Sequence, residues 1–368
     1  MSYKARIANF WKGKKVIVTG HSGFKGSWLV ILLHSLGAKV YGISLEPNTK
    51  PNLFEIASIN SLCESIFCDI GNYQALKGYV ETIAPDIVFH LAAQSLVRQS
   101  YKNPMETFTT NIIGSANVLE SLLPSKTVKS IVMVTTDKVY ENREWVYPYR
   151  EIDPLGGHDP YSASKAASEI VIASYRESLF CKSGNVAIST ARAGNVIGGG
   201  DWSEDRLIPD AIKAWTAGSS LLIRNPDAIR PWQHVLEALF GYLILSQKQF
   251  EDKEFSGSYN FGPDKAGSWS VRAIAESAKT YFNKDASITY VKNASEPHEA
   301  NLLFLDTSKS MHRLHVRPTW TLNEAIRRTV TWYLDLDRGG GNDALSLCMR
   351  DINDFWKKNE ENNTLPTL

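Results

Sequence analysis

The sequence predicts an α/β fold, a doubly wound parallel sheet with a smaller C-terminal α/β lobe, and three observations predict it. Short β-branched runs alternate with longer segments of helical periodicity from residue 15 onward, which is the pattern of βαβ units. A glycine-rich turn, GHSGFKG, follows the first run and opens the first long helical segment. With 368 residues, of which 43% are hydrophobic, the chain is long enough to bury a large core and form a second lobe.

The elements of the expected sheet follow one another through the first half of the chain. The strand KVIVT is followed by a helix over residues 28–36, the strands KVYGIS and ESIFC, a helix over 73–83 and the strand DIVFH. A helix over 106–123, the strand SIVMVTT, a helix over 160–179 and the strand NVAISTAR complete the series. Alternation of this kind predicts parallel strands covered by helices on both faces.

The regular alternation of strands and helices ends after Arg192, where GNVIGGGDW gives a glycine-rich loop and shorter elements follow. We therefore expect residues 1–195 to form mainly a dinucleotide-binding domain. Residues 196–368 are expected to form mainly a substrate lobe, with some segments returning to the main sheet. The polar stretch from Asn359 onward is expected to be frayed.

Charge and composition disfavour several classes of partner. The 40 basic and 39 acidic residues give a formal net charge of +1, so neither nucleic acid nor an acidic membrane is the expected partner. The most apolar helical segment, over residues 28–36, is too short to cross a bilayer, and residues 1–15 lack the apolar core of a signal peptide. The four cysteines form no CxxC pair, and the eight histidines form no HxH or HExxH cluster. We expect free thiols, a cytoplasmic location and no metal site.

The loop GHSGFKG has the residue types that a Rossmann-type dinucleotide site requires. Glycine allows a tight turn and a close backbone approach, and the N-terminus of the following helix offers unpaired N–H groups to a pyrophosphate. An isolated glycine triplet is also compatible with a plain strand-to-helix turn, but this one lies between a predicted strand and helix at the start of a βαβ unit. The expected cofactor-binding residues of this loop are Gly20, Gly23, Phe24, Lys25 and Gly26.

Further cofactor contacts are expected where later strands end. Asp69 is placed to meet the adenine or simply to cap a turn, and the LAA segment after the fourth strand allows either close backbone approach or plain tight packing. The second strand ends without an acidic residue, and Glu46 follows only two residues beyond Ser44, which leaves both NAD and NADP open. The expected contacts from these later strands are Asp69, Ile70, Leu91, Ala92, Ala93 and Thr135.

His21 is a bulky residue inside the glycine loop. Beside the pyrophosphate it would narrow the site, and with no acid directly at the end of the second strand we expect NAD to bind loosely. The alternative is that His21 is a solvent-exposed loop residue with no influence on the cofactor.

Two motifs bring catalytic residue types to the same region. Tyr161 and Lys165 lie one turn apart on a helix, where the lysine ammonium would lower the pKa of the phenol and let it accept a hydroxyl proton. Thr136, Asp137 and Lys138 follow the fifth strand, at the carboxyl edge where such folds bind ligands. A YxxxK pair alone is also compatible with a surface helix, but here it converges with the glycine loop and the TTDK segment.

The motifs GHSGFKG, DIVFHLAAQ, TTDKVY, YSASK and RAGNVIGGGDW resemble, in order and spacing, the extended short-chain dehydrogenases that act on nucleotide sugars. The resemblance covers nearly the whole chain. Longer strings such as GFKGSWL, DKVYENREW, RLIPD and RPWQHVLE resemble the CDP-glucose 4,6-dehydratases in particular. This implies an NAD-dependent hydro-lyase that oxidises C4 of the sugar, removes water across C5 and C6 and returns the hydride to C6.

The resemblance also implies a role for each catalytic residue. Thr136 would hydrogen-bond the sugar 4-hydroxyl, Tyr161 would be the base, and Lys165 would hold the nicotinamide ribose and tune Tyr161. Asp137 is the expected acid for the departing 6-hydroxyl. Lys138 stands where the dTDP-glucose dehydratases have a glutamate that acts as base at C5. It would act either as that base, with a depressed pKa, or as an electrostatic stabiliser of the enolate.

Two alternatives stay open beside the CDP-glucose dehydratase. One is a 4,6-dehydratase or 4-epimerase for a GDP-, UDP- or dTDP-linked sugar, and the other is a non-catalytic dinucleotide-binding protein. Asp137 favours dehydration over epimerisation, because an epimerase has no need of an acid after the threonine. Intact Thr136, Tyr161 and Lys165 disfavour a protein that only binds.

The expected substrate contacts lie mainly in the second half of the chain, where cations can meet a diphosphate. Trp202 and Trp232 would stack on the base or simply pack in the core, and His298 and Glu299 resemble a stretch near the nucleotide. The resemblance further implies a homodimer formed by the helix over 106–123 and the helix of Tyr161, and a place in 3,6-dideoxyhexose and O-antigen biosynthesis. The expected substrate-binding residues are Gln94, Asn195, Arg206 and Arg230.

Overall fold

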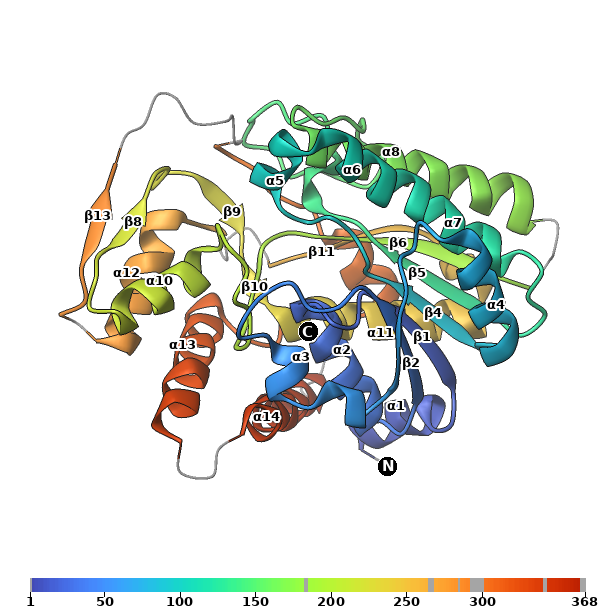
Figure 1. Ribbon diagram of the computed structural model, residues 1–368, viewed down its shortest axis with the longest axis horizontal. Helices are drawn as coiled ribbons and strands as arrows, with labels where there is room; N and C mark the ends of the chain where they lie inside the picture. The colour runs from blue at the N-terminus through green and yellow to red at the C-terminus, as the bar shows by residue number, and fades with distance from the viewer. Residues whose placement is uncertain are drawn as a thin grey trace.

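A seven-stranded parallel sheet forms the centre of the molecule (Figure 1). The computed structural model describes residues 2–181, 185–263, 268–283, 285–291, 301–339 and 343–364. The strand order is β11-β6-β5-β4-β1-β2-β3, so the chain winds outward from β1 to β3 and then crosses back to β4. The doubly wound fold predicted from the sequence is confirmed, and its topological switch point lies between β1 and β4.

Seven strands and the helices on both faces make up this main unit. The strands are β1 (Lys15–Thr19), β2 (Lys39–Ser44), β3 (Glu64–Phe67), β4 (Ile87–His90), β5 (Ser130–Val134), β6 (Ala187–Ala193) and β11 (Gly257–Phe261). On one face lie α4 (Tyr73–Ile83), α7 (Gly114–Leu122) and α8 (Pro160–Ser174), and on the other α2 (Phe24–Ser35), α11 (Val235–Glu251) and α14 (Ala344–Thr364). Helix α1 (Tyr3–Trp11) packs against α14.

The helix expected over residues 106–123 is divided into three consecutive segments. They are α6 (Pro104–Phe108), a π-helical turn (Thr109–Ile113) and α7, and the short α5 (Val97–Lys102) precedes them. The helix expected over 160–179 is α8 followed by a second π-helical turn, Tyr175–Phe180. The sequence periodicity thus locates the helical stretches, whereas the wider turns inside them are visible only in the structure.

The second half of the chain builds a smaller lobe beside the sheet (Figure 1). Its strands form two-stranded sheets, β8 (Leu221–Ile223) with β13 (Ile288–Tyr290) and β9 (Ile229–Pro231) with β12 (Ser268–Ser270). Helices α10 (Leu207–Thr216), α12 (Val271–Phe282) and α13 (Leu322–Arg338) accompany them. Between the lobe and the sheet, β7 (Val196–Ile197) pairs with β10 (Gln233–His234). The domain boundary at residue 195 stays a prediction.

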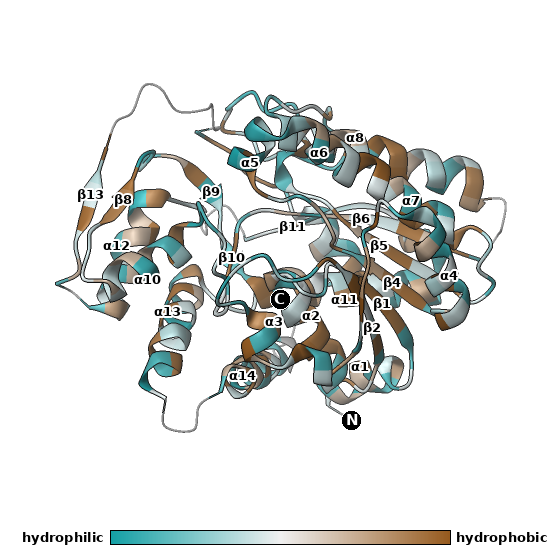
Figure 2. Ribbon diagram, viewed as in Figure 1, coloured by the Kyte–Doolittle hydropathy of each residue, from teal (hydrophilic) through white to brown (hydrophobic). Residues whose placement is uncertain are grey.

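The core lies between the sheet and its covering helices. Strands β4 and β5 are buried along their whole length, as expected for parallel strands covered on both faces. Figure 2 shows their apolar character in brown. Helix α11 is buried along most of its length, because it lies beneath the sheet and contacts β5 and β6. Within the described ranges, no helix combines the length and apolarity that a membrane crossing requires.

The expectation that the chain frays from Asn359 onward is wrong up to residue 364, and residues 365–368 lie outside the described residues. Helix α14 continues to Thr364, and Asn359 is buried with its amide Nδ2 donating to Thr319 Oγ1 at 2.9 Å. One turn earlier, Phe355 and Trp356 are buried and pack against Phe240 of α11. Polar composition alone misses this segment, because two aromatic side chains anchor it to the core.

Candidate active site

The glycine loop meets the end of β4 in a backbone contact that excludes larger side chains. Gly20 has a φ of +75°, and a Cβ on it would lie 2.7 Å from the backbone nitrogen of Ala92. A Cβ on Gly26 would lie 2.0 Å from the carbonyl oxygen of Gly20. Thr19 Oγ1 supports the same contact by accepting the N–H groups of Leu91 and Ala92 at 3.1 and 3.2 Å.

The start of α2 is open to an anion. Its N-cap is Gly23, which makes no side-chain capping hydrogen bond. The N–H groups of the first helical turn therefore have no side-chain acceptor at this end, and the positive end of the helix dipole faces the loop. The residues present fit the pyrophosphate of a dinucleotide.

Asp69 and Ile70 lie near the end of β3 (Glu64–Phe67), separated from it by Cys68, close to where the sequence predicts. Asp69 Oδ1 accepts the N–H of Gly71 at 2.7 Å, which is the turn-capping contact. Ile70 is buried beneath Gly114, where a Cβ would lie 2.6 Å from the Ile70 Cδ1 atom. Contacts of Asp69 and Ile70 with an adenine stay a prediction.

His21 does not narrow the pyrophosphate site, and it is not solvent-exposed. Its ring is fully buried against β2, where a Cβ on Gly42 would lie 2.3 Å from it. Its two nitrogens lie 3.0 Å from Ser44 Oγ and 2.6 Å from Ser65 Oγ. Burial lowers the pKa of His21 to about 4, so the ring is neutral at pH 7. Loose NAD binding stays a prediction, now without this steric reason.

Tyr161 and Lys165 are buried on the first turns of α8. The helix begins at Pro160, with Asp159 as N-cap accepting the Ser162 N–H at 2.9 Å. Burial raises the pKa of Tyr161 to about 12, although a hydrogen bond with Thr136 opposes the rise. Burial lowers the pKa of Lys165 to about 8, and its ammonium donates to the carbonyl oxygen of Val134 at 3.3 Å. The predicted pair is thus directed at the end of β5.

Thr136 and Asp137 are buried immediately after β5. Thr136 Oγ1 donates to Asp137 Oδ1 at 2.9 Å. Asp137 is 1% exposed, and its Oδ2 has no hydrogen-bond partner in the part of the chain that the structure describes. A buried carboxylate oxygen without a donor is unfavourable, so this atom is suited to receive a hydroxyl group of a ligand. Lys138 follows it and is partly exposed.

Lys25 reaches the catalytic groups from the glycine loop. Burial lowers its pKa to about 8, the charge of Arg206 lowers it further, and the charge of Asp137 opposes both. The charge of Lys25 in turn lowers the pKa of Lys165. Its ammonium lies 5.9 Å from the ring centre of Tyr242 on α11. The sequence predicts Lys25 as a cofactor contact, and the structure adds that it belongs to the charge cluster of the catalytic residues.

The predicted substrate residues are divided between the sheet edge and the lobe. Arg206 precedes α10, and its Nη2 donates to the carbonyl oxygen of Ser95 at 3.3 Å. Arg230 is buried on β9, and Asn195 carries a buried Oδ1 atom that has no partner among the described residues. The side-chain amide of Gln94 donates to Leu96 O and Thr107 Oγ1.

Trp202 and Trp232, which would stack on the base or pack in the core, both lie against other residues of the protein. Trp202 packs edge-on against Trp332 and Tyr333. Trp232 lines a small cavity between α11 and α13, which is described below. His298 and Glu299 lie outside the described residues.

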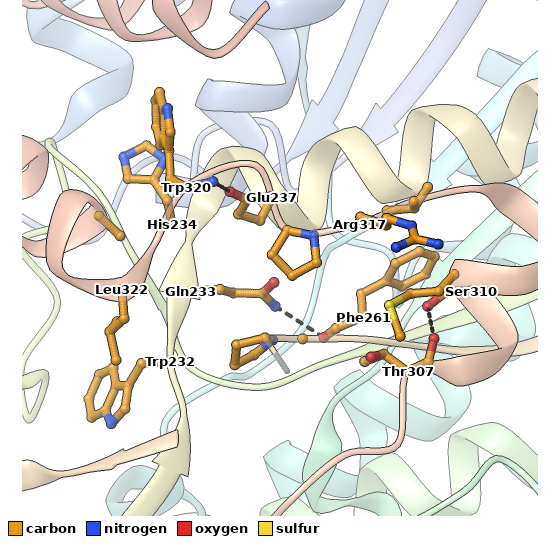
Figure 3. Close-up of a pocket in the computed structure, with 16 residues that line it drawn as sticks. Trp232, Gln233, His234, Glu237, Phe261, Thr307, Ser310, Arg317, Trp320 and Leu322 are labelled. Carbon is orange, nitrogen blue, oxygen red and sulfur yellow. Dashed lines mark hydrogen bonds between the residues drawn. The ribbon is translucent and has the colours of Figure 1, made fainter. Parts of the chain in front are cut away.

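A cavity of about 30 Å³ is lined in part by Trp232, Gln233 and His234 of the RPWQHV segment (Figure 3). Glu237 accepts the N–H groups of Thr319 and Trp320 there, at about 3.0 and 2.8 Å, and burial raises its pKa to about 7. Gln233 Nε2 donates to the carbonyl oxygen of Phe261 at 3.0 Å. This volume holds roughly two water molecules, so the cavity is too small for a nucleotide sugar.

Two buried residues beneath the site are missed by the sequence motifs. Glu169 of α8 and Arg192 of β6 form an ion pair with an N···O distance of 2.8 Å, and both are at most 3% exposed. The available signal is that Glu169 stands one helical turn after Lys165, on the face of Tyr161. Within the described residues, no group of three or more histidine, cysteine, aspartate or glutamate side chains is arranged to hold a metal ion.

The fold and the site together define a nucleotide-sugar enzyme of the extended short-chain dehydrogenase class. The chain belongs to the family described as GDP-mannose 4,6 dehydratase, whose model matches residues 17–329. It is 45% identical over 352 residues to the CDP-glucose 4,6-dehydratase of Salmonella typhimurium strain LT2, covering 94% of this chain and 97% of that protein.

Solved structures share the fold. The dTDP-glucose 4,6-dehydratase of Bacillus anthracis str. Ames in complex with NAD has a TM-score of 0.74 at 22% identity, covering 89% of this chain and 98% of that one. The UDP-glucose 4-epimerase of Thermotoga maritima with UDP-glucose has a TM-score of 0.77 at 22% identity, covering 87% and 99%. At this identity the two structures support the architecture, and both a dehydratase and an epimerase fit it.

Gly26→Ala is expected to weaken NAD binding at least about tenfold, equivalent to about 1.4 kcal/mol, because its Cβ collides with Gly20 O and displaces the start of α2. Titration calorimetry with NAD and thermal unfolding measure the two effects. Gly78→Ala, in the open interior of α4, is the matched control and should leave NAD binding unchanged while stabilising the helix by up to about 1 kcal/mol. Wild-type NAD affinity in Gly26→Ala would contradict the assignment of the loop.

Proposed function

We propose that this chain is a CDP-glucose 4,6-dehydratase that forms CDP-4-keto-6-deoxyglucose. The main evidence for dehydration is Asp137. Its carboxyl group is buried next to Thr136, and one of its oxygens has no partner among the described residues. A dehydratase needs an acid at this position and an epimerase does not. The choice of CDP-glucose is supported by the 45% identity to a CDP-glucose 4,6-dehydratase over almost the whole length of both chains.

The cofactor in this proposal is NAD. The uncapped N-terminus of α2 and the glycine contacts with β4 would hold its pyrophosphate, and Lys165 its nicotinamide ribose. The segment Ser44–Leu45–Glu46 at the end of β2 contains no arginine or lysine, the residue types that accommodate the extra phosphate of NADP. When bound, NAD supplies the reversible oxidation at C4 of the sugar.

The chain's own residues handle the protons. Tyr161 accepts the proton of the sugar 4-hydroxyl, which Thr136 orients through a hydrogen bond. The Lys165 ammonium stabilises the phenolate form of Tyr161. The resulting 4-keto group acidifies the proton at C5, which passes to a base, and Lys138 is the candidate. Asp137, in its protonated form, gives a proton to the 6-hydroxyl, which departs as water. Arg206, Arg230, Gln94 and Asn195 are the proposed contacts for the rest of the nucleotide sugar.

Incubation of the purified protein and NAD with CDP-glucose is expected to give a product lighter by one water. Mass spectrometry and the absorbance of the 4-keto sugar in base detect it. Parallel reactions with dTDP-, UDP- and GDP-linked sugars test the nucleotide, and turnover of CDP-glucose alone is expected. A sugar of changed configuration and unchanged mass would indicate a 4-epimerase instead.

Lys138→Met is expected to slow elimination by roughly 10²–10⁴-fold, the range of general acid–base catalysis. Lys138→Arg separates the two candidate roles, because arginine keeps the charge but does not release a proton at neutral pH. If Lys138 is the C5 base, both variants are equally slow; if it stabilises the enolate, the arginine variant retains most of its rate. Exchange of the C5 proton with deuterated solvent follows the step directly. Unchanged elimination in Lys138→Met would remove both roles.

The proposal includes a homodimer formed by the helices above the active site. Met105 of α6, Ile113 of the π-helical turn and Ile170 of α8 are 72%, 54% and 61% exposed. Figure 1 shows α6, α7 and α8 side by side on one face of the sheet. Large apolar side chains exposed on neighbouring helices are typical of an interface. The cytoplasmic location inferred from cysteine usage is part of the same proposal.

Analytical ultracentrifugation is expected to give twice the chain mass of 41.1 kDa for the wild type. The double variant Ile113→Glu, Ile170→Glu should sediment as a monomer, because two buried carboxylates per subunit would oppose association. Leu222→Glu, at the 52% exposed Leu222 on β8 of the lobe, is the control and should remain dimeric. A monomeric wild type would refute the interface.

A further inference from the structure

Glu169 occupies a position on α8 from which it would ordinarily pair with Lys165. Tyr161, Lys165 and Glu169 are spaced by four residues each and share one face of the helix. Glu169 is 2% exposed, so its charge requires a partner. The ammonium of Lys165 nevertheless donates to the carbonyl oxygen of Val134, and no ion pair joins it to Glu169 in the described part of the chain.

Arg192 is the partner that Glu169 uses instead. Glu169 Oε1 accepts Arg192 Nε at 2.9 Å and Thr135 Oγ1 at 2.5 Å. Its Oε2 accepts Arg192 Nη2 and Thr190 Oγ1, both at 2.8 Å. Four hydrogen bonds, two of them in a bidentate pair with a guanidinium, fill the acceptor capacity of this carboxylate.

Arg192 is itself fixed from three further directions. Its Nη1 donates to Tyr140 OH at 2.9 Å and to the carbonyl oxygen of Glu151 at 3.2 Å, and its Nη2 donates to Ser258 Oγ at 3.2 Å. A guanidinium held by this many acceptors cannot turn away from Glu169 without losing several hydrogen bonds. The ion pair is therefore a rigid part of the floor beneath the catalytic residues.

We propose that Arg192 is a positioning residue that occupies Glu169 and thereby keeps the ammonium of Lys165 unpaired and available to Tyr161 and the cofactor. Without Arg192, a buried and uncompensated Glu169 would draw Lys165 into an ion pair one helical turn away. That pairing would neutralise the positive charge on which the phenolate of Tyr161 depends. The consequence for catalysis rests on the proposed function, whereas the state of Lys165 does not.

Several charged or titratable groups face the two catalytic residues, and all of them except Glu169 stay in place in the variants below. Burial lowers the pKa of His90 to about 3, so this neighbour of Lys165 is neutral throughout the relevant pH range. The groups facing Lys165 are Lys25, His90 and Glu169, and those facing Tyr161 are Arg206, Asp137, Asp159 and Tyr242.

The first test is an NMR titration of Lys165 in protein containing isotope-labelled lysine, with Lys165→Met used to assign its signal. Arg192→Met is expected to raise the titration midpoint of Lys165 by about one pH unit or more, because Glu169 then pairs with it. The double variant Arg192→Met, Glu169→Met removes both buried charges and should return the midpoint to the wild-type value. Thermal unfolding verifies that each variant is folded.

The second test is the pH profile of the dehydration rate in the same proteins. In Arg192→Met, the fall of the dehydration rate on the acidic side of the profile should move to higher pH by about one unit, and the rate near pH 7 should be lower by about tenfold or more. In the double variant this acid limb of the profile should return to its wild-type position. The proposal is overturned if neither the Lys165 midpoint nor the acid limb is displaced in Arg192→Met. It is also overturned if the double variant keeps both the displaced Lys165 midpoint and the displaced acid limb.

Glu169→Gln serves if Arg192→Met does not fold. It removes the negative charge while retaining an acceptor for Thr135, so the Lys165 midpoint should not rise; a rise overturns the proposal. A wild type that acts on none of the nucleotide sugars counts against the proposed function alone, because the NMR titration needs no substrate.

Discussion

The close approach of two backbone segments at the switch point of the sheet fixes the position of the whole site. β1 and β4 are hydrogen-bonded neighbours, yet the chain leaves them toward opposite sides of the sheet. Their carboxyl ends therefore open a crevice, and Gly20 allows the loop after β1 to touch the backbone of Ala92 after β4. The start of α2 is thereby held beside the sheet edge. Lys25 on that turn reaches the groups that β5 and α8 supply.

Positive charge is concentrated in this crevice. Lys25, Lys165 and Arg206 interact with one another or with Tyr161, whereas Asp137 is the acidic side chain that acts on both Lys25 and Tyr161. Burial lowers the pKa of both lysines to about 8, with repulsion from Arg206 acting on Lys25 and repulsion from Lys25 acting on Lys165, so both cations are disfavoured in the protein alone. Such an arrangement is suited to a ligand that brings negative charge, as a nucleoside diphosphate does. The electrostatics and the proposed substrate are consistent with each other.

The sequence predicts the sheet and the catalytic edge because both depend on local patterns. β-branched runs identify the inner strands, and the carboxyl ends of parallel strands must meet, so Thr136 and Tyr161 are expected together. The direction in which a buried side chain points, in contrast, depends on residues that are far away in the sequence. His21 turns beneath Gly42 of β2, which no motif indicates, and β11 with the sequence GSYNF lacks the apolar pattern of a strand. The Arg192–Glu169 pair joins residues from a strand and a helix whose register only the folded sheet defines.

The state of Tyr161 connects these features to the order of events in catalysis. The phenol lies in the first turn of α8, where the helix dipole favours a negative charge, but the N-cap carboxylate of Asp159 and the carboxylate of Asp137 oppose it. With Lys165 present, the pKa of Tyr161 is still about 12. In the chain alone, burial and these two carboxylates thus favour the protonated phenol, and a positive charge placed next to the ring would favour the phenolate. In the proposed function, the nicotinamide cation of bound NAD would supply such a charge, so the base would form in a site that holds its cofactor.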